Sequence, residues 1–124
     1  MLRPTNEQRQ WLLDIVDNID RIERHRHGLG LAEFDANETV RDAVERCLQR
    51  VTEAVIRLGD AGADLLPDQD LKGLRGLGNF LRHKYDRVDA NLIWEYLDQD
   101  APMLREVAWA SASINSRTGR EDNL

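Results

Sequence analysis

The sequence predicts an all-α fold, a bundle of four to five helices. Apolar residues recur at steps of three and four through most of the chain, which is the period of amphipathic helices. No segment shows the alternation of β-branched and polar residues that is typical of strands. A chain of 124 residues has the size of one domain. We therefore expect a single helical domain over residues 1–116 and a polar C-terminal tail over residues 117–124.

The first expected helix begins at Thr5, which forms a capping-box pattern with Gln8. Its apolar face is made of Leu12, Ile15, Ile19 and Ile22. The segment 25–30, which contains two glycines, interrupts the pattern and is expected to end the helix.

The second expected helix is long, with Asn37 as its cap and Gly59 as its stop. Its apolar positions are Val40, Val44, Cys47, Leu48, Val51, Val55 and Leu58. Cys47 is thus interpreted as a core residue. Because it is the one cysteine in the sequence, it excludes a disulfide within the chain.

Three shorter helices are expected after a loop at residues 62–67. The third begins at Asp68 or Asp70, and Asp89 caps the fourth, since aspartate favours that position. Asp100 followed by Pro102 opens the fifth, because proline is tolerated in the first turn of a helix.

Charge is distributed unevenly along the chain. The net charge is −6, yet residues 72–87 contain five Lys or Arg and one Asp, which gives +4 there and leaves −10 elsewhere. This basic window surrounds His83, which carries a titratable imidazole. The pattern indicates a place where an anionic ligand is bound.

The third helix has two different faces. Leucines at positions 71, 74, 77 and 81 share one side. Arg75, Asn79 and His83 follow at steps of four and are expected on roughly the opposite side, as a polar and basic stripe.

The third helix also contains three glycines, Gly73, Gly76 and Gly78. Each costs about 0.8–1.0 kcal/mol relative to alanine inside a helix. Their number suggests that another helix or a ligand approaches this backbone closely.

Residues 76–85, Gly-Leu-Gly-Asn-Phe-Leu-Arg-His-Lys-Tyr, resemble the signature of the HepT-like toxins. These are bacterial proteins of the HEPN superfamily, with an arginine and an asparagine followed by His-x-Tyr. Residues 42–49 and 53–58 are similar to that family's second helix, and residues 92–94 and 100–104 to its ending. The resemblance extends roughly from Trp11 to Val107 and implies an HEPN-like bundle.

The resemblance implies metal-independent cleavage of RNA, in which the 2′-hydroxyl attacks its own phosphodiester. His83 would be the general acid or base, and Asn79 would orient the site. Arg75 and Arg82 would offset charge on the phosphate. Further RNA phosphate contacts are expected from Lys72, Lys84 and Arg87.

The resemblance also implies partners and regulation. Members of the family form homodimers, and they are toxins controlled by an MntA-like nucleotidyltransferase antitoxin that transfers AMP to the motif tyrosine, here Tyr85. Side chains two residues apart on a continuous helix point away from each other. A site shared by His83 and Tyr85 therefore requires the helix to end near His83. No cofactor is implied.

The chain departs from the family pattern at one position. Gly78 stands where the family arginine usually precedes the asparagine. Arg75 lies eight positions before His83, about 12 Å along a helix axis, and could act from the second protomer; Arg82 is adjacent to the histidine. The alternative function is a non-catalytic HEPN-like dimeric module that binds a nucleotidyltransferase or a nucleotide. Gly78 favours this alternative, and the retained His-Lys-Tyr favours the nuclease.

Other interpretations of these residues stay open. The cations could form only a solvated basic face, and Tyr85 could simply close the end of the bundle. His25 and His27 lack Cys, Asp or Glu at ligand spacing, so no metal site is expected. No apolar run approaches the ~20 residues that span a bilayer, and we expect no membrane association and a cytoplasmic location.

Overall fold

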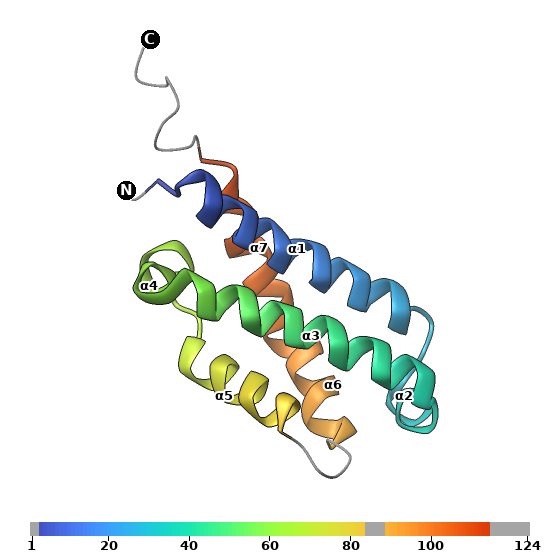
Figure 1. Cartoon of the computed structure of the whole chain (residues 1–124). Coiled ribbons are helices and arrows are strands. Elements are labelled where there is room, and N and C mark those ends of the chain that lie inside the picture. Colours follow the sequence, from blue (N-terminus) through green and yellow to red (C-terminus); the bar gives the residue numbers. More distant parts are fainter. Residues whose placement is uncertain (1–2, 84–88, 115–124) are drawn as a thin grey trace.

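The computed structural model describes residues 3–83 and 89–114, and this part of the chain is helical without strands, which confirms the all-α prediction (Figure 1). The longer helices are α1 (Asn6–Arg26), α3 (Glu38–Leu58), α5 (Leu71–Arg82), α6 (Ala90–Gln99) and α7 (Ala101–Ala112). The shorter elements are α2 (Leu31–Ala36), α4 (Gly62–Leu65) and the 3₁₀ turn η1 (Gly59–Ala61). No helix of the described ranges is long and apolar enough to cross a membrane.

The helices begin at the caps that the sequence predicts. Thr5 and Gln8 form the full capping box, with backbone-to-side-chain distances of 3.1 and 3.0 Å. The side chain of Asn37 accepts from the backbone of α3 at 3.0 Å. Asp70 and Asp89 do the same for α5 and α6 at 2.9 and 2.8 Å. Of the two aspartates considered for the third predicted helix, the structure uses Asp70.

Two connections contain more helix than the sequence predicts. The link between α1 and α3 includes α2, whose Phe34 is fully buried. Residues 62–65, expected as loop, form α4, and Leu65 and Leu66 at its end are buried. Helices of four to six residues are too short to show a hydrophobic period, so their apolar residues are not distinguishable from buried loop positions.

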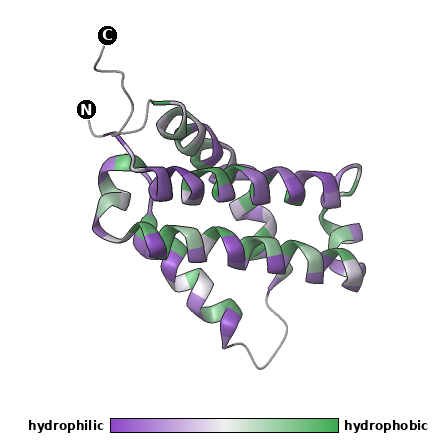
Figure 2. Ribbon diagram, turned by 45° about the horizontal axis from the view of Figure 1, so that its top comes forward, coloured by the Kyte–Doolittle hydropathy of each residue, from purple (hydrophilic) through white to green (hydrophobic). Residues whose placement is uncertain are grey.

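The core lies where α1, α3 and α7 meet, and the apolar side of each helix is turned inward (Figure 2). Fully buried side chains come from each of these helices and include Leu12, Ile15, Leu48, Val51 and Leu104. Cys47 is buried among them, as predicted. Figure 1 shows α5 lying beside α3 at the edge of this core and α6 lying near α2.

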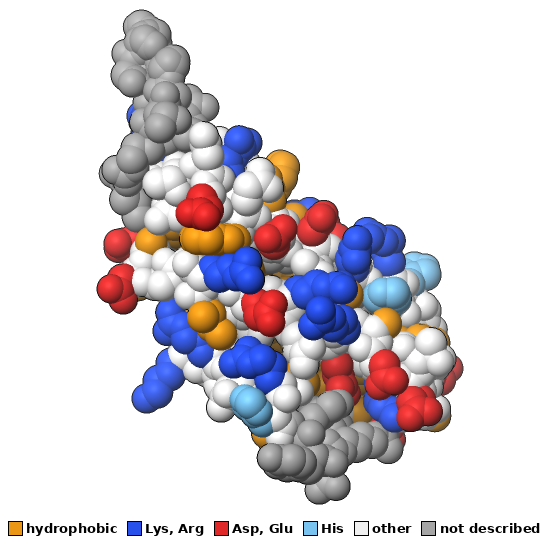
Figure 3. All heavy atoms as spheres, viewed as in Figure 1, with side chains coloured by type: hydrophobic (Ala, Val, Ile, Leu, Met, Phe, Trp, Pro, Cys, Tyr) orange, Lys and Arg blue, Asp and Glu red, His pale blue; other side chains and the backbone are white. Residues whose placement is uncertain are grey.

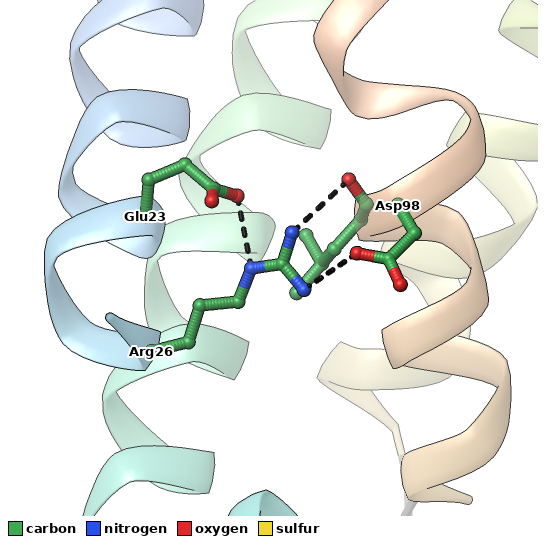
Figure 4. Close-up of polar contacts among 4 residues, drawn as sticks. Glu23, Arg26 and Asp98 are labelled. Carbon is green, nitrogen blue, oxygen red and sulfur yellow. Dashed lines mark hydrogen bonds and ion pairs between the residues drawn. The ribbon is translucent and has the colours of Figure 1, made fainter. Parts of the chain in front are cut away.

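The side chain of Arg26 connects the C-terminal end of α1 to α6 (Figure 4). Its guanidinium forms ion pairs with Glu23 at 3.0 Å and with Asp98 at 2.9 Å, and it donates to the Leu97 carbonyl at 3.5 Å. The same group lies 4.5 Å from the centre of the Trp94 ring, a cation–π geometry. Because this side chain is largely buried, its several partners compensate for its desolvation.

α5 packs against α3 through a close approach of the two backbones. The buried residues of α5 are Leu71, Leu74, Gly78 and Leu81. A Cβ atom added to Gly78 would lie 2.4 Å from Oγ1 and 2.5 Å from Cβ of Thr52, which is fully buried on α3. The Thr52 hydroxyl cannot turn away freely, since it donates to the Gln49 carbonyl at 2.7 Å. One of the three glycines of α5 thus has the close neighbour that the sequence predicts, and that neighbour is a helix.

We predict opposite effects for two alanine substitutions in α5. Gly78→Ala should lower the free energy of unfolding by about 1–2 kcal/mol, because the overpacking cost exceeds the gain in helix propensity. Gly76→Ala should raise it by up to about 1 kcal/mol, because a Cβ there meets nothing within 4 Å. Urea unfolding of both variants at one protein concentration measures the difference. Equal stability of the two variants would contradict the close packing of α5 on α3.

Candidate active site at the C-terminal end of α5

His83 is the first residue after α5. It is the C-cap, with φ −116° and ψ 18°, and its backbone N–H donates to the Asn79 carbonyl at 3.2 Å. Its side chain is exposed. The helix therefore ends where a site shared with the motif tyrosine requires it to end. Tyr85 itself lies outside the described residues, as do Lys84 and Arg87.

The structure brings Asn79, Arg82 and His83 together within one helical turn. Asn79 and Arg82 are exposed, like His83. Arg75 lies two turns earlier, on nearly the same side of α5 as Arg82, because seven residues make almost two full turns. It is half-buried, with Nη2 3.9 Å from the place of a Cβ at Gly62, so it lies close to α4. Within one protomer, therefore, Arg75 lies about two helical turns away from His83.

Position 78, where the family motif has arginine, faces the interior. The sequence interpretation places Leu77 on the apolar side of this helix, and the structure agrees: Leu77 is half-buried and packs against the core, while Gly78 beside it is buried. The buried row of α5 runs at steps of three and four through Leu71, Leu74, Gly78 and Leu81. An arginine at 78 would point at Thr52 of α3.

α3 contributes side chains to this end of α5 that the sequence interpretation missed. Gln49 donates through Nε2 to the Leu81 carbonyl at 3.2 Å. Its Oε1 accepts from Nη1 of Arg46 at 3.3 Å. The local sequence pattern does not indicate these hydrogen bonds of Gln49, because they depend on how α3 and α5 pack against each other in space.

Basic side chains are frequent on the face of the molecule formed by α3 and α5. Figure 3 shows Lys and Arg side chains over both helices, with single carboxylates between them. Lys72, Arg75 and Arg82 belong to α5, and Arg46 to α3. No acidic residue lies within α5. The excess of positive charge on this face comes from α5 and is suited to an anionic group.

A cleft of about 510 Å³ lies on the other side of α5, between α5, α6 and α7. Tyr96 lines it, and burial, followed by the charges of Asp100 and Asp70, raises the pKa of the Tyr96 hydroxyl. Large apolar side chains stay exposed on the three helices around it: Phe80 is 54% exposed, Leu92 60% and Met103 57%. Exposed apolar side chains that gather into one patch are typical of a protein interface.

The described ranges contain no group of three His, Cys, Asp or Glu side chains that could hold a metal ion. The groups at the end of α5 are an imidazole, guanidinium groups and an amide. This set can transfer a proton and bind phosphate.

Comparison with known proteins gives a consistent result. A family model described as "Ribonuclease HepT-like" matches residues 15–110. The chain is 28% identical over 103 residues to "Putative RNase MJ1216" of Methanocaldococcus jannaschii, which covers 83% of this chain and 85% of that protein. It is also 28% identical over 96 residues to "Putative RNase MJ1380" of the same organism, covering 77% of this chain and 88% of that protein. None of the solved structures matches the chain significantly.

Proposed function

The chain belongs to the HepT-like ribonuclease family, and we propose that it is an endoribonuclease that cleaves RNA without a metal ion. The observation that carries the proposal is His83. It is exposed at the end of α5, beside Arg82 and Asn79, in a chain whose relatives are named as RNases.

The reaction follows from these groups. The neutral imidazole of His83 accepts the proton of a ribose 2′-hydroxyl, and the 2′-oxygen attacks the adjacent phosphorus. The bond between phosphorus and the 5′-oxygen of the next nucleotide breaks, and that oxygen takes up a proton from an acid, either the imidazolium or water. Guanidinium groups stabilise the additional negative charge of the transition state. Arg82 and Arg75 are the cations of α5 for this role, Asn79 orients the site, and Lys72, Lys84 and Arg87 bind further phosphates.

We further propose that the protein is the toxin of a bacterial toxin–antitoxin pair and acts in the cytoplasm. Its antitoxin would be an MntA-like nucleotidyltransferase that transfers AMP to Tyr85. An AMP group adds negative charge and bulk next to His83, and this repels RNA phosphate. The end of α5 at Arg82 supports the proposal, because side chains two residues apart on a continuous helix point away from each other.

A homodimer is part of the proposal, with its interface alongside α5. Exposed apolar side chains on α5, α6 and α7, namely Phe80, Leu92 and Met103, support it. The cleft between the three helices gives a second chain a concave surface.

The packing of Gly78 favours a second candidate function. The motif arginine is absent and its position is closed by Thr52, which is compatible with a non-catalytic dimeric module that binds a nucleotidyltransferase or a nucleotide. The two functions differ in one measurable property, the cleavage of RNA by the purified protein.

If the protein is a nuclease of this kind, His83→Ala should lose RNA cleavage without losing stability. RNA cleavage in EDTA should fall by about 10²–10⁴-fold, the usual contribution of a general acid or base. The melting temperature should stay unchanged, because the side chain is exposed. His25→Ala, at an exposed histidine near the end of α1, is the matched control and should cleave normally. Cleavage that needs a metal ion, or full activity of the His83 variant, would rule the mechanism out.

If the interface lies at this cleft, two substitutions in α7 should differ in their effect on the sedimentation mass. Met103→Glu should sediment as a monomer at micromolar concentration, because it places a charge in the cleft beside α5. Trp109→Glu should remain a dimer, although Trp109 is also exposed. It lies about 120° around the helix from Met103. A monomeric wild-type protein would exclude this interface.

Control by AMP transfer predicts a mass increase of whole AMP units after co-expression with the cognate nucleotidyltransferase. The increase should disappear in Tyr85→Phe and persist in Tyr96→Phe, because Tyr96 is half-buried in the cleft between α5, α6 and α7 and not part of the His-Lys-Tyr motif. Peptide mass spectrometry locates the modification. An active nucleotidyltransferase that leaves the wild type unmodified, or a shift that survives Tyr85→Phe, would show that Tyr85 has no such role.

A further inference from the structure

The proposed nuclease needs a guanidinium near the scissile phosphate, and position 78 does not supply one. Gly78 is closed in by Thr52, and Arg75 lies two turns from His83 on the same protomer. Arg82 is one cation next to His83, and a second can come from the helix packed beside the end of α5. That helix is α3.

Arg46 of α3 is held at this place by two hydrogen bonds in series. Its Nη1 donates to Gln49 Oε1 at 3.3 Å, and Gln49 Nε2 donates to the Leu81 carbonyl at 3.2 Å. Leu81 precedes His83 by two residues and lies in the last turn of α5. The chain of bonds thus links the Arg46 guanidinium to the turn that carries Arg82 and ends at His83.

Gln49 has a physical reason to take this orientation. The carbonyls in the last turn of a helix have no partner within the regular part of that helix, and the amide N–H of Gln49 binds the one at Leu81. Once the amide donates in this direction, its oxygen is the group left for Arg46. Gln49 is half-buried between the helices, so its position is fixed by packing as well.

We infer that Arg46 binds the RNA phosphate at His83 and replaces the arginine that Gly78 displaces from the family motif. This rests on the proposed nuclease function. A guanidinium has five N–H donors, and the bond to Gln49 uses one of them. Two others can bind a phosphate in the bidentate geometry that arginine favours. Arg46 is exposed, so RNA can reach it without a rearrangement of the fold.

The inference assigns different roles to the two residues of α3. Arg46 contacts the substrate directly. Gln49 is a positioning residue that acts through Arg46. Arg82 supplies a second cation from the last turn of α5, so that the phosphate is bound by both helices.

The test compares Arg46→Ala with Arg57→Ala, which removes the same charge from an exposed position eleven residues along α3, about 16 Å away. Cleavage of a labelled single-stranded RNA in EDTA gives kcat/KM. Arg46→Ala should lower it by about 100-fold, as expected for the loss of a donor to transition-state charge. Arg57→Ala should remain within about threefold of the wild type, since it loses only long-range attraction.

RNA binding is measured separately in the His83→Ala background, where cleavage does not interfere. Adding Arg46→Ala should weaken binding and reduce the slope of log affinity against log salt concentration by about 0.7, the value for one lost contact with a single-strand phosphate. Adding Arg57→Ala should leave the slope unchanged. All variants should melt within about 2 °C of their parent, because exposed side chains are replaced.

Gln49→Ala tests the positioning role. It should lower kcat/KM by less than Arg46→Ala, and the double variant should be no worse than Arg46→Ala alone, because the effect of Gln49 passes through Arg46. Additive losses would show that Gln49 acts independently.

The outcomes separate this inference from the function on which it rests. Wild-type cleavage with a fully active Arg46→Ala variant would overturn the inference and leave the nuclease in place. The same holds if Arg75→Ala abolishes cleavage while Arg46→Ala does not. If the wild type cleaves no RNA, the proposed function fails, and the role of Arg46 is then tested by RNA binding alone. If Arg46→Ala weakens RNA binding no more than Arg57→Ala does, the role of Arg46 is overturned.

Discussion

The contact between Gly78 and Thr52 determines where α5 lies. Because a Cβ at position 78 would come within 2.5 Å of Thr52 Oγ1 and Cβ, glycine lets the two backbones approach more closely than any other residue would. This approach sets the rotation of α5, with Leu74, Gly78 and Leu81 inward and Asn79 and Arg82 outward. It also brings the end of α5 within hydrogen-bonding distance of Gln49. The position of His83 depends on this one packing constraint.

The same constraint explains how the chain departs from its family while it keeps the histidine. A glycine at the motif arginine permits tight helix packing and removes a cation from the motif. In the proposed site, the cations beside His83 are Arg82, from the last turn of α5, and Arg46, which is linked to that turn through Gln49. In the proposed nuclease, proton transfer and charge stabilisation are carried by different groups, and the glycine affects only the second.

Much of the fold was predictable from the sequence because its signals are local. The caps at Thr5, Asn37, Asp70 and Asp89 and the stop at Gly59 depend on residues within one turn of the boundary, and all of them are confirmed. The short helices α2 and α4 were not predictable, since they contain too few residues to show a period. His83 was found through its motif and its basic neighbours. Arg46 and Gln49 were not, because their link to α5 joins residues 32 positions apart.

The central claim is that the end of α5 cleaves RNA through the 2′-hydroxyl of the substrate. The most direct test is the chemistry of the product ends, determined by mass spectrometry after digestion of a defined RNA by the purified protein in EDTA. The account predicts 2′,3′-cyclic phosphates on the upstream fragments and 5′-hydroxyls on the downstream fragments, because the 2′-oxygen is the nucleophile and the 5′-oxygen leaves. Fragments with 3′-hydroxyls and 5′-phosphates would contradict it, since water would then be the nucleophile.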